Sequence, residues 1–321
     1  MDLPTLTELE TAADLVHRSV PPTPQHCWPL LSARLGTDLW VKHENHTATG
    51  AFKLRGGLVY LDDLRRAQPG IAGVISATTG NHGQSIAYAA TRVGLKAMIV
   101  VPHGNSPEKN SAMIGFGAKL VEHGHDFQAA YEHAMATAER ENLHPVRSFH
   151  PLLLRGVASY GLELFRALPD LDVVYVPIGL GSGICGVIAA REALGLTTEI
   201  VGVVAESAAT YALSFAAGKP VATNSADTFA GGLAVRVPDT EALAVVCQHA
   251  ARVVTVSEAE MKAAIRIIFS DTHNVAEGAG AAPFAAALKE RDKLRGKKVA
   301  VVLSGGNIDR ALFAEILAGT D

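Results

Sequence analysis

The stretch at residues 173–194 reads VVYVPIGLGSGICGVIAAREAL and places a strand pattern, a glycine-rich turn and a helix pattern in succession. The apolar run at its start is typical of a buried strand, and the run from residue 184 is typical of a helix. Between them, Gly179, Leu180, Gly181, Ser182 and Gly183 expose successive backbone N–H groups at a helix start, which favours phosphate. A tight connection without a ligand would have the same sequence. The turn is neither G-x-G-x-x-G nor a P-loop, so a nucleotide is not favoured.

The same order of strand, turn and helix recurs along the chain. Short apolar runs lie at residues 74–76, 97–101, 173–176, 200–204, 253–256 and 299–303, and helical patterns such as 84–92 and 126–141 lie between them. This alternation predicts βαβ units and parallel sheets, with ligand loops at the carboxyl ends of strands. We therefore predict an α/β protein of two open twisted domains with the active site in the cleft between them. The smaller domain is predicted at residues 73–150, and the larger one is formed by 1–72 and 151–321.

Bulk composition narrows the class of protein. The chain has 321 residues, of which 48% are hydrophobic and 19% charged, as expected for a soluble protein with a sizeable core. A net charge of -4 gives no sign of a nucleic-acid or polybasic membrane surface. No apolar run approaches the roughly 20 residues that cross a bilayer, and the acidic N-terminus does not resemble a secretory signal. The cysteines at 27, 185 and 247 form no disulfide or zinc pattern, so we expect a cytoplasmic protein.

Lys53 is the candidate reactive group. It lies in the run TGAFKLRGG at residues 49–57, where glycines let other groups approach closely and Phe52 is placed to lie against a flat ring. A lysine in an apolar pocket has a lowered pKa and forms Schiff bases with carbonyl compounds. An isolated lysine is more often a solvated surface residue. The prediction therefore depends on the other turns.

Two further polar turns follow predicted strands. The run TTGNHG at residues 78–83 offers two hydroxyls, from Thr78 and Thr79, with backbone amides and Asn81 at a helix start, a combination that suits a carboxylate. Ordinary N-capping by Thr79 or Asn81 is the alternative, and His82 is more readily a structural histidine than a general base. The run SGGN at 304–307 places the Ser304 hydroxyl where it can donate to a ring nitrogen. No metal-binding histidine spacing and no serine-hydrolase elbow occurs.

In this order and spacing, the four motifs resemble those of the fold-type II pyridoxal-phosphate enzymes, which have the tryptophan synthase β-like fold. The resemblance is to the serine/threonine dehydratase and serine racemase group and covers about residues 21–318. It implies pyridoxal 5′-phosphate as the cofactor, held by Lys53 as a Schiff base, with Lys53 also acting as the base at the substrate Cα. It further implies that Phe52 packs on the cofactor ring, that Asn81 bonds the ring oxygen and that residues 179–183 bind the phosphate.

The resemblance gives roles to the remaining candidates as well. Ser304 would meet the pyridine nitrogen, Glu277 matches a family glutamate near the cofactor, and the turn of Thr78, Thr79, Gly80, Asn81 and His82 would receive the substrate carboxylate. A serine does not force the pyridine nitrogen to stay protonated, so the ring is a weaker electron sink and loss of a β-substituent is favoured. The resemblance thus predicts an ammonia-lyase that converts a 3-hydroxy amino acid into a 2-oxo acid and ammonia.

Alternatives stay open at this point. An amino-acid racemase with side elimination is the second reading, but Thr79 stands where similar racemases carry a serine as the acid/base of the second face. A binding protein without turnover is the third, and it has no need of a Schiff-base lysine. Glu206 matches one ligand of the divalent-cation site of some relatives, but Ala212 stands at the second, which argues against a structural cation.

Other features concern substrate and assembly. Residues 155–163 differ from the Gly-Gln-Gly-Thr run of threonine dehydratases and resemble the subgroup that acts on phenylserine, hydroxyaspartate or products of hydroxyectoine breakdown. Gly231 stands where relatives often carry aspartate. The sequence continues only briefly beyond Ser304, so no regulatory domain and no feedback by isoleucine is expected. Relatives are commonly homodimers, and a homodimer is expected here.

Overall fold

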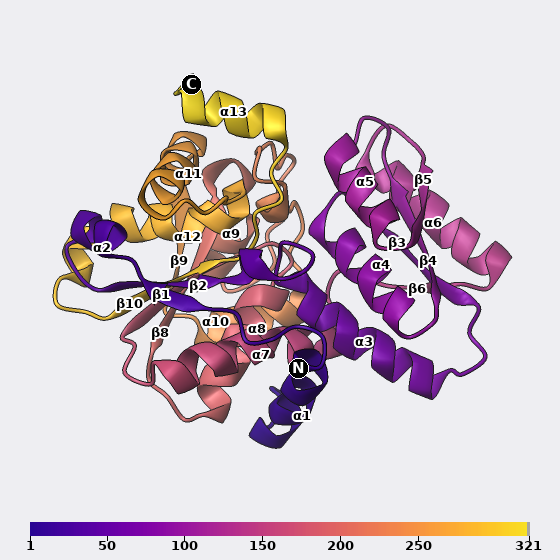
Figure 1. Cartoon of the computed structure of the whole chain (residues 1–321), viewed down its shortest axis with the longest axis horizontal. Coiled ribbons are helices and arrows are strands. Elements are labelled where there is room, and N and C mark those ends of the chain that lie inside the picture. The colour runs from indigo at the N-terminus through magenta and orange to yellow at the C-terminus, as the bar shows by residue number, and fades with distance from the viewer. Residues whose placement is uncertain (320–321) are drawn as a thin grey trace.

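The computed structural model describes residues 1–319, which form two separate β-sheets. The large sheet has the strand order β1-β2-β10-β7-β8-β9, and the small sheet has the order β5-β4-β3-β6 (Figure 1). Neighbouring strands are parallel except for the edge pair β1 and β2, which is antiparallel. The strands are β1 Gln25–Cys27, β2 Leu39–His43, β3 Gly73–Ala77, β4 Lys96–Val101, β5 Ala118–Glu122, β6 His144–Pro145, β7 Val173–Pro177, β8 Glu199–Ala205, β9 Arg252–Val256 and β10 Val299–Leu303.

Helices connect the strands and cover both sheets. They are α1 Leu6–His17, α2 Pro29–Leu35, α3 Lys53–Ala67, α4 Asn81–Arg92, α5 Pro107–Gly115, α6 Phe127–Glu141, α7 Pro151–Ala167, α8 Ser182–Ala193, α9 Thr210–Ala217, α10 Thr240–His249, α11 Glu258–Thr272, α12 Gly278–Lys289 and α13 Arg310–Ala318. Several begin at side-chain caps, such as the capping boxes of Thr5 with Glu8 and of Ser257 with Glu260. Within residues 1–319, no helix is both long and apolar enough to span a bilayer.

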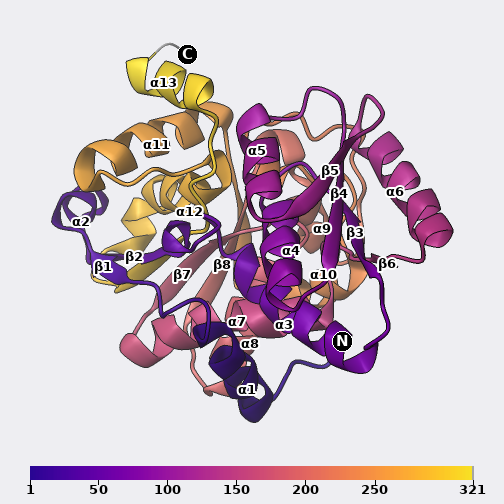
Figure 2. The same cartoon turned by 45° about the vertical axis from the view of Figure 1, so that its right-hand side comes forward.

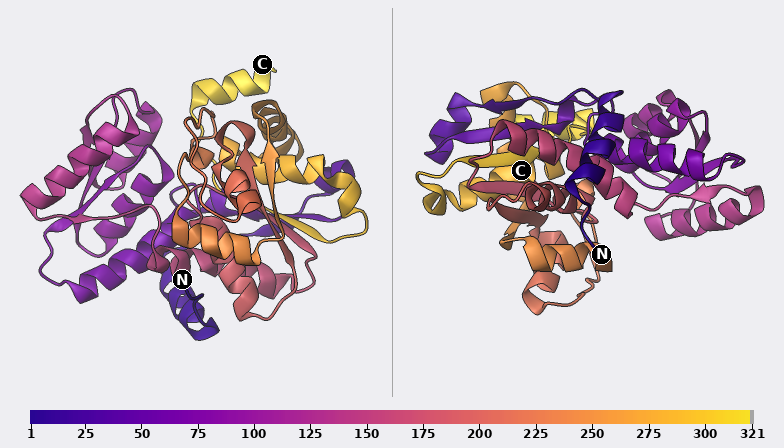
Figure 3. Two further views of the ribbon diagram at one scale, coloured as in Figure 1. Left: turned by 180° about the vertical axis from the view of Figure 1, so that it is seen from behind. Right: turned by 90° about the horizontal axis from the view of Figure 1, so that it is seen from below.

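The large sheet is buried on both faces, which explains why its central strands are continuous apolar runs. Alternate residues enter different cores. Val174 and Val302 belong to a core with helices α7, α8 and α10, whereas Tyr175 and Val301 belong to a core with α2, α11 and α12. Figure 3 shows these helices on both sides of the sheet.

The small sheet with helices α4, α5 and α6 is called the small lobe here, and the large sheet with α7 to α13 the large lobe. In the small lobe, α4 and α6 pack against opposite faces of β3 and β4. Helix α3 lies between the lobes, because it packs on α4 and on α7 (Figure 1). The close packing of α3 against α7 and against α4 requires glycine on both sides of the helix. A Cβ at Gly56 would lie 2.7 Å from the Leu153 carbonyl oxygen, and one at Gly57 would lie 2.3 Å from Ser85 Oγ.

The predicted fold class is confirmed, with two α/β units built on largely parallel sheets. Each apolar run named above forms a strand. The helical pattern at 84–92 lies within α4, and the pattern at 126–141 matches α6 with its N-cap residue Asp126. The antiparallel edge strand β1 was not predicted. The domain limits at residues 73 and 150 stay a prediction, and the small sheet lies inside them, from Gly73 to Pro145.

Candidate active site

Lys53 is the first residue of α3, and backbone contacts hold it beside the end of β10. The Phe52 amide donates to the Ser304 carbonyl oxygen at 3.0 Å, and Ala51 forms an antiparallel bridge with Gly305. These contacts join two of the predicted motifs, which are about 250 residues apart in the sequence. The structure therefore brings Lys53 and Ser304 to one place.

Asn81, at the start of α4, connects the small lobe to this place. Its Nδ2 donates to Glu277 Oε1 at 2.7 Å, and its Oδ1 accepts from Asn307 Nδ2 at 2.8 Å. The Glu277 backbone amide in turn donates to the Gly305 carbonyl oxygen at 3.1 Å. Since both sides of the Asn81 amide have partners, the orientation of its donor group is fixed. Asn81, Glu277 and the 304–307 turn therefore lie together.

The electrostatic surroundings of Lys53 lower the pKa of its amine. Burial lowers its pKa to about 8, while the negative charge of Glu277 acts in the opposite direction. The Nζ atom lies 4.9 Å from the centre of the Phe52 ring. A lysine with this pKa has a substantial neutral fraction near pH 7–8, and the neutral amine is the form that attacks a carbonyl.

The 179–183 turn leaves the N-terminus of α8 open. Gly181 is the N-cap residue of this helix, with a φ of 105°, and no side chain within residues 1–319 caps it. A Cβ at Gly179 would lie 2.4 Å from the Gly232 carbonyl oxygen, and one at Gly181 would lie 2.5 Å from the Ala242 Cβ. Glycines are therefore required here. The uncapped amides form a cradle that suits a phosphate group.

Two tyrosines fix the carbonyl groups of this turn. The Tyr211 hydroxyl donates to the Leu180 carbonyl oxygen at 2.9 Å, and the Tyr160 hydroxyl donates to the Gly183 carbonyl oxygen at 3.1 Å. A Cβ at Gly183 would lie 3.4 Å from Phe52 Cζ, so the turn also borders the Phe52 ring. Ser182 is buried at the helix start. No local pattern points to the two tyrosines, which come from the distant helices α7 and α9.

The turn before α4 is likewise uncapped. Its N-cap residue is Gly80, and in the described part of the chain no side chain bonds the first amides of the helix. The alternative that Thr79 or Asn81 caps the helix is therefore wrong. Thr78 is buried and its hydroxyl accepts from the Gly80 amide at 3.4 Å, whereas Thr79 is exposed. The free amides suit an anion such as a carboxylate.

His82 differs from the satisfied structural histidine that the sequence favoured. Its ring is buried, and its Nε2 atom has no hydrogen-bond partner among residues 1–319. Burial lowers its pKa to about 3, and the positive charge of Lys53 acts in the same direction. His82 is therefore neutral at physiological pH. A buried polar atom without a partner is costly, so this nitrogen is a candidate for contact with a bound group.

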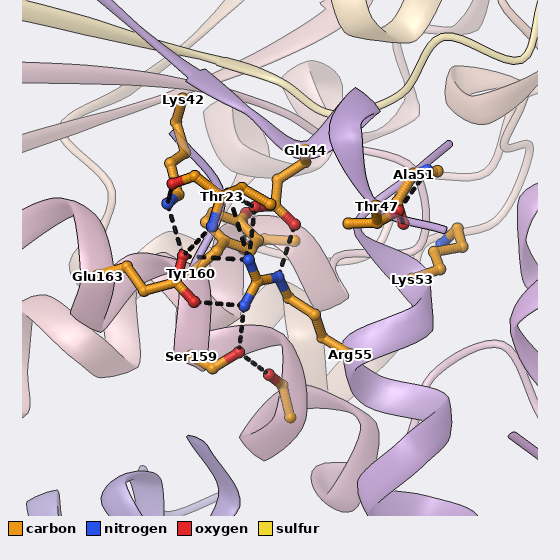
Figure 4. A network of polar contacts seen from close by, with 12 residues as sticks. Thr23, Lys42, Glu44, Thr47, Ala51, Lys53, Arg55, Ser159, Tyr160 and Glu163 are labelled. Carbon is orange, nitrogen blue, oxygen red and sulfur yellow. Dashed lines mark hydrogen bonds and ion pairs between the residues drawn. The ribbon is translucent and has the colours of Figure 1, made fainter. Parts of the chain in front are cut away.

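A buried ionic network was missed by the sequence analysis. Arg55 donates to Glu44 Oε2 at 2.7 Å and to Glu163 Oε1 at 2.6 Å, and Lys42 Nζ donates to Glu163 Oε2 at 2.6 Å. Figure 4 shows that this network lies on one side of α3, while Lys53 points away from it. The network ties β2, α3 and α7 together. A charged residue in an otherwise apolar stretch of helix, such as Glu163 in α7, is the sequence feature that could have indicated this network.

Glu206, the residue that matched a cation ligand, is paired with a lysine. Lys289 Nζ lies 3.2 Å from Glu206 Oε1, 3.2 Å from Glu260 Oε2 and 3.0 Å from the Thr255 carbonyl oxygen. No group of three or more His, Cys, Asp or Glu side chains in the described chain is placed to hold a metal ion. The ammonium of Lys289 thus supplies positive charge to Glu206.

The residues fit a phosphorylated aromatic aldehyde. An amine with a lowered pKa lies beside an aromatic ring, a glycine cradle, an oriented Asn81 amide and a buried serine at a strand end. Such a set defines a class of enzyme that holds its cofactor through a lysine Schiff base in a two-sheet α/β fold.

The comparisons identify the family. The chain belongs to the pyridoxal-phosphate-dependent enzymes, because the family model "Pyridoxal-phosphate dependent enzyme" matches residues 16–305. It is 35% identical over 292 residues to the L-threonine ammonia-lyase of Thermotoga maritima, covering 90% of this chain and 72% of that protein. Among solved structures, threonine deaminase isoform 2 from Solanum lycopersicum gives a TM-score of 0.90 at 29% identity, covering 99% and 97% of the two chains. Maize serine racemase gives 0.92 at 25% identity, covering 99% and 98%.

These findings place the chain in the fold-type II group of threonine dehydratases and serine racemases, and they confirm pyridoxal phosphate as the cofactor.

Proposed function

We propose that the protein is an ammonia-lyase that removes the β-hydroxyl of a 3-hydroxy amino acid and yields a 2-oxo acid and ammonia. The observation that carries this proposal is Lys53, whose pKa is lowered to about 8 and which lies near the uncapped start of α4. Bound pyridoxal phosphate supplies the electron-withdrawing ring that acidifies the substrate Cα proton and lets the β-substituent leave. The similarity to the L-threonine ammonia-lyase of Thermotoga maritima supports the same reaction type.

Each residue of the site has a proposed part in holding the cofactor. The amides of residues 179–183 bind the phosphate, and Phe52 lies against the ring. Asn81 donates to the ring oxygen with its second Nδ2 hydrogen, since the first is directed to Glu277. Ser304, at the end of β10, bonds the ring nitrogen without supplying the negative charge that would keep this nitrogen protonated.

The protein groups then position the substrate and move protons. The Thr78–His82 turn binds the α-carboxylate through the free amides of α4. The Lys53 amine takes the Cα proton and, as an ammonium, donates a proton to the departing hydroxyl. Because His82 is neutral, its ring does not attract the substrate carboxylate as a cation would.

The substrate class is proposed more finely than the family shows. We propose one of the less usual 3-hydroxy amino acids, such as phenylserine or 3-hydroxyaspartate, because residues 155–163 resemble that subgroup. In the structure, two members of this stretch form ion pairs with other residues: Arg155 pairs with Glu8, and Glu163 pairs with Lys42 and Arg55. Their effect on a substrate would therefore be indirect.

A substrate panel tests the proposed function. Purified holoenzyme is given serine, threonine, phenylserine and 3-hydroxyaspartate in threo and erythro forms, and both ammonia and 2-oxo acid are measured. Release of both products in equal amounts from at least one compound, and none from a Lys53→Ala variant, is the expected result. Failure of every compound to yield either product would overturn the proposal.

Racemisation is the second candidate, and similarity to maize serine racemase favours it. Thr79 is exposed in the turn before α4. A second acid/base on the other face of the substrate would exchange the Cα proton with inversion. Incorporation of solvent deuterium into the opposite enantiomer, faster than ammonia release, would decide for racemisation.

We also propose that residues 73–150 form one small domain that carries the substrate-carboxylate turn, and that the protein acts as a cytoplasmic homodimer on a small amino acid. The small lobe supports the first of these points, because its sheet is formed within Gly73–Pro145. Limited proteolysis of the holoenzyme locates the domain limits, and its sedimentation measures the oligomeric state.

A further inference from the structure

Helix α5 of the small lobe carries one cation without a partner near the candidate site. Lys109 lies in its first turn, half-buried, and its ammonium forms no hydrogen bond or ion pair within residues 1–319. Unpaired surface lysines are ordinary, but this one is directed by its position toward the turn before α4. A Cβ at Gly80 would lie 3.7 Å from Lys109 Cδ, so the lysine stem passes over the middle of that turn.

A second observation places the charge of Lys109 near the same residues. Burial raises the pKa of Glu277, and among the groups that act against this increase, Lys109 has a larger effect than Asn81 or Lys53. Glu277 is bonded to Asn81, which begins α4. Lys109 is therefore close to the turn that precedes α4 and also to Glu277, the carboxylate bonded to the first residue of α4.

The backbone of Lys109 is held by an exchange of helix caps between the lobes. Ser106 caps α5 by accepting from the Lys109 amide at 3.2 Å, and its hydroxyl also donates to Asp309. Asp309 is the N-cap residue of α13 but forms no cap bond in the described chain, and Glu108 takes its place by accepting from the Arg310 amide at 3.0 Å. Figure 2 shows α5 beside the segment that leads to α13. The first turn of α5 is thus fixed to the large lobe.

Two positive groups lie beside each other at the start of α4, and neither forms an ion pair within residues 1–319. The uncapped N-terminus of α4 carries a partial positive charge, and the Lys109 ammonium adds a full one beside it. Glu277 is the nearby carboxylate, but it lies beyond ion-pair distance of Lys109 in the part of the chain that the structure describes. A carboxylate bound at the turn would be attracted by both positive groups.

We propose that Lys109 binds the α-carboxylate of the amino-acid substrate, together with the free amides of the Thr78–His82 turn. This inference rests on the proposed function and adds a substrate-recognition residue to it. The exchange of caps at Ser106 and Glu108 positions Lys109 for this contact. Because α5 belongs to the small lobe, substrate binding draws on a group outside the cofactor loops.

The test measures binding without turnover. L-2-Aminobutyrate has an α-carboxylate but no β-hydroxyl to lose, so its affinity is obtained from the change in visible absorbance of the holoenzyme. Its amide, L-2-aminobutyramide, is the matched ligand without the carboxylate. In Lys109→Met the affinity for L-2-aminobutyrate is expected to fall about tenfold, as for the loss of a charged hydrogen bond, and the affinity for the amide to stay within about twofold. Lys109→Arg should recover most of the loss.

Controls separate this result from other causes. Lys119 is exposed on β5 of the same lobe, so Lys119→Met removes an equal charge and should leave both affinities unchanged. An unaltered cofactor absorbance in Lys109→Met shows that the site is intact. Equal weakening of both ligands, no weakening, or a wild-type holoenzyme that does not respond to L-2-aminobutyrate would each overturn the proposal. Ammonia release from the substrate panel judges the proposed function separately.

Discussion

Lys53 and Arg55 lie two residues apart on the first turn of α3, yet their surroundings are opposite (Figure 4). Arg55 is fully buried and paired with Glu44 and Glu163, and these carboxylates raise its pKa despite burial. Lys53 has no ion pair within residues 1–319, so burial dominates and lowers its pKa to about 8. The comparison shows two charge balances on one helix turn: two carboxylates outweigh burial at Arg55, whereas burial outweighs the charge of Glu277 at Lys53.

The largest expected effect comes from Lys53→Met. Activity should fall by at least on the order of 10⁴-fold, because the variant lacks the amine that we propose to hold the cofactor and to move the Cα proton. The cofactor-free protein should nevertheless become more stable at pH 7, by up to about 3 kcal/mol, because burying the lysine charge lowers its pKa from 10.5 to about 8.

The sign of the pH dependence follows from proton binding. Between pH 8 and 10.5 the unfolded state holds the lysine proton and the folded state does not, so wild-type stability rises with pH in this window. The advantage of Lys53→Met should therefore shrink from pH 8 to pH 10.5. Urea unfolding of both cofactor-free proteins at pH 7 and pH 10 measures this. A Lys53→Met variant that is less stable than wild type at pH 7 would show that burial of the Lys53 charge does not destabilise the folded protein.

Arg55→Met should give the opposite stability effect. It removes the ion pair of buried Glu44 and leaves buried Glu163 with Lys42 in place of two cations, at a cost of about 3–5 kcal/mol. In the wild type, Arg55 is among the groups that lower the pKa of Glu163, so its removal raises that pKa. The difference in the free energy of unfolding between wild type and Arg55→Met should thus become smaller as the pH falls and Glu163 of the variant takes up a proton.

Urea unfolding at pH 7 and pH 5 checks the Arg55 prediction. Arg66 is the matched control, because it lies on the same helix with its side chain 71% exposed and pairs with Asp62 on the surface. Arg66→Met should cost less than about 1 kcal/mol. If the two arginine variants lost equal stability, the buried network would not have the role given to it here.

The smallest expected effect concerns Glu277→Gln. The charge of Glu277 raises the pKa of Lys53, so its removal should lower that pKa below its wild-type value of about 8. The glutamine oxygen still accepts from Asn81, which keeps the geometry. The rate at which pyridoxal phosphate adds to the cofactor-free protein, followed by visible absorbance across pH, should show its midpoint at lower pH. A midpoint that stays or rises would remove Glu277 from the surroundings of Lys53.

Local patterns predicted much of the fold. Buried central strands such as β7 and β10 are apolar runs because both faces are covered, and this signal is visible in the sequence. Strands β1, β2, β5 and β6 were not predicted. The two shortest of them are the edge strands β1 and β6. They have three and two residues and rely on a neighbour's backbone rather than on their own burial.

The site was predictable where glycines and strand ends mark it, and not where distant side chains complete it. Lys53, Asn81 and Ser304 stand in motifs with a local pattern. The bond between Asn81 and Glu277 joins residues 196 positions apart, and that between Arg55 and Glu163 joins residues 108 positions apart. Such pairs depend on how helices pack, which no local pattern records. His82 is a case in which the residue type misled the prediction. A histidine in a structural position normally has hydrogen-bond partners, and only the structure shows that its Nε2 atom has none within residues 1–319.

The pairing of β2 with β10 has a consequence for synthesis on the ribosome. Asn307 donates to the Thr49 carbonyl oxygen from 258 positions further along the chain, and β2 has β10 as its parallel partner. At about 5–20 residues per second, the segment that carries Lys53 is exposed for roughly 10–50 s before β10 emerges. The strands of the small sheet are all translated by residue 145 and can pair much earlier. A nascent chain therefore carries an unpaired β2 edge for most of its synthesis, and this edge is exposed to wrong pairing until β10 is translated.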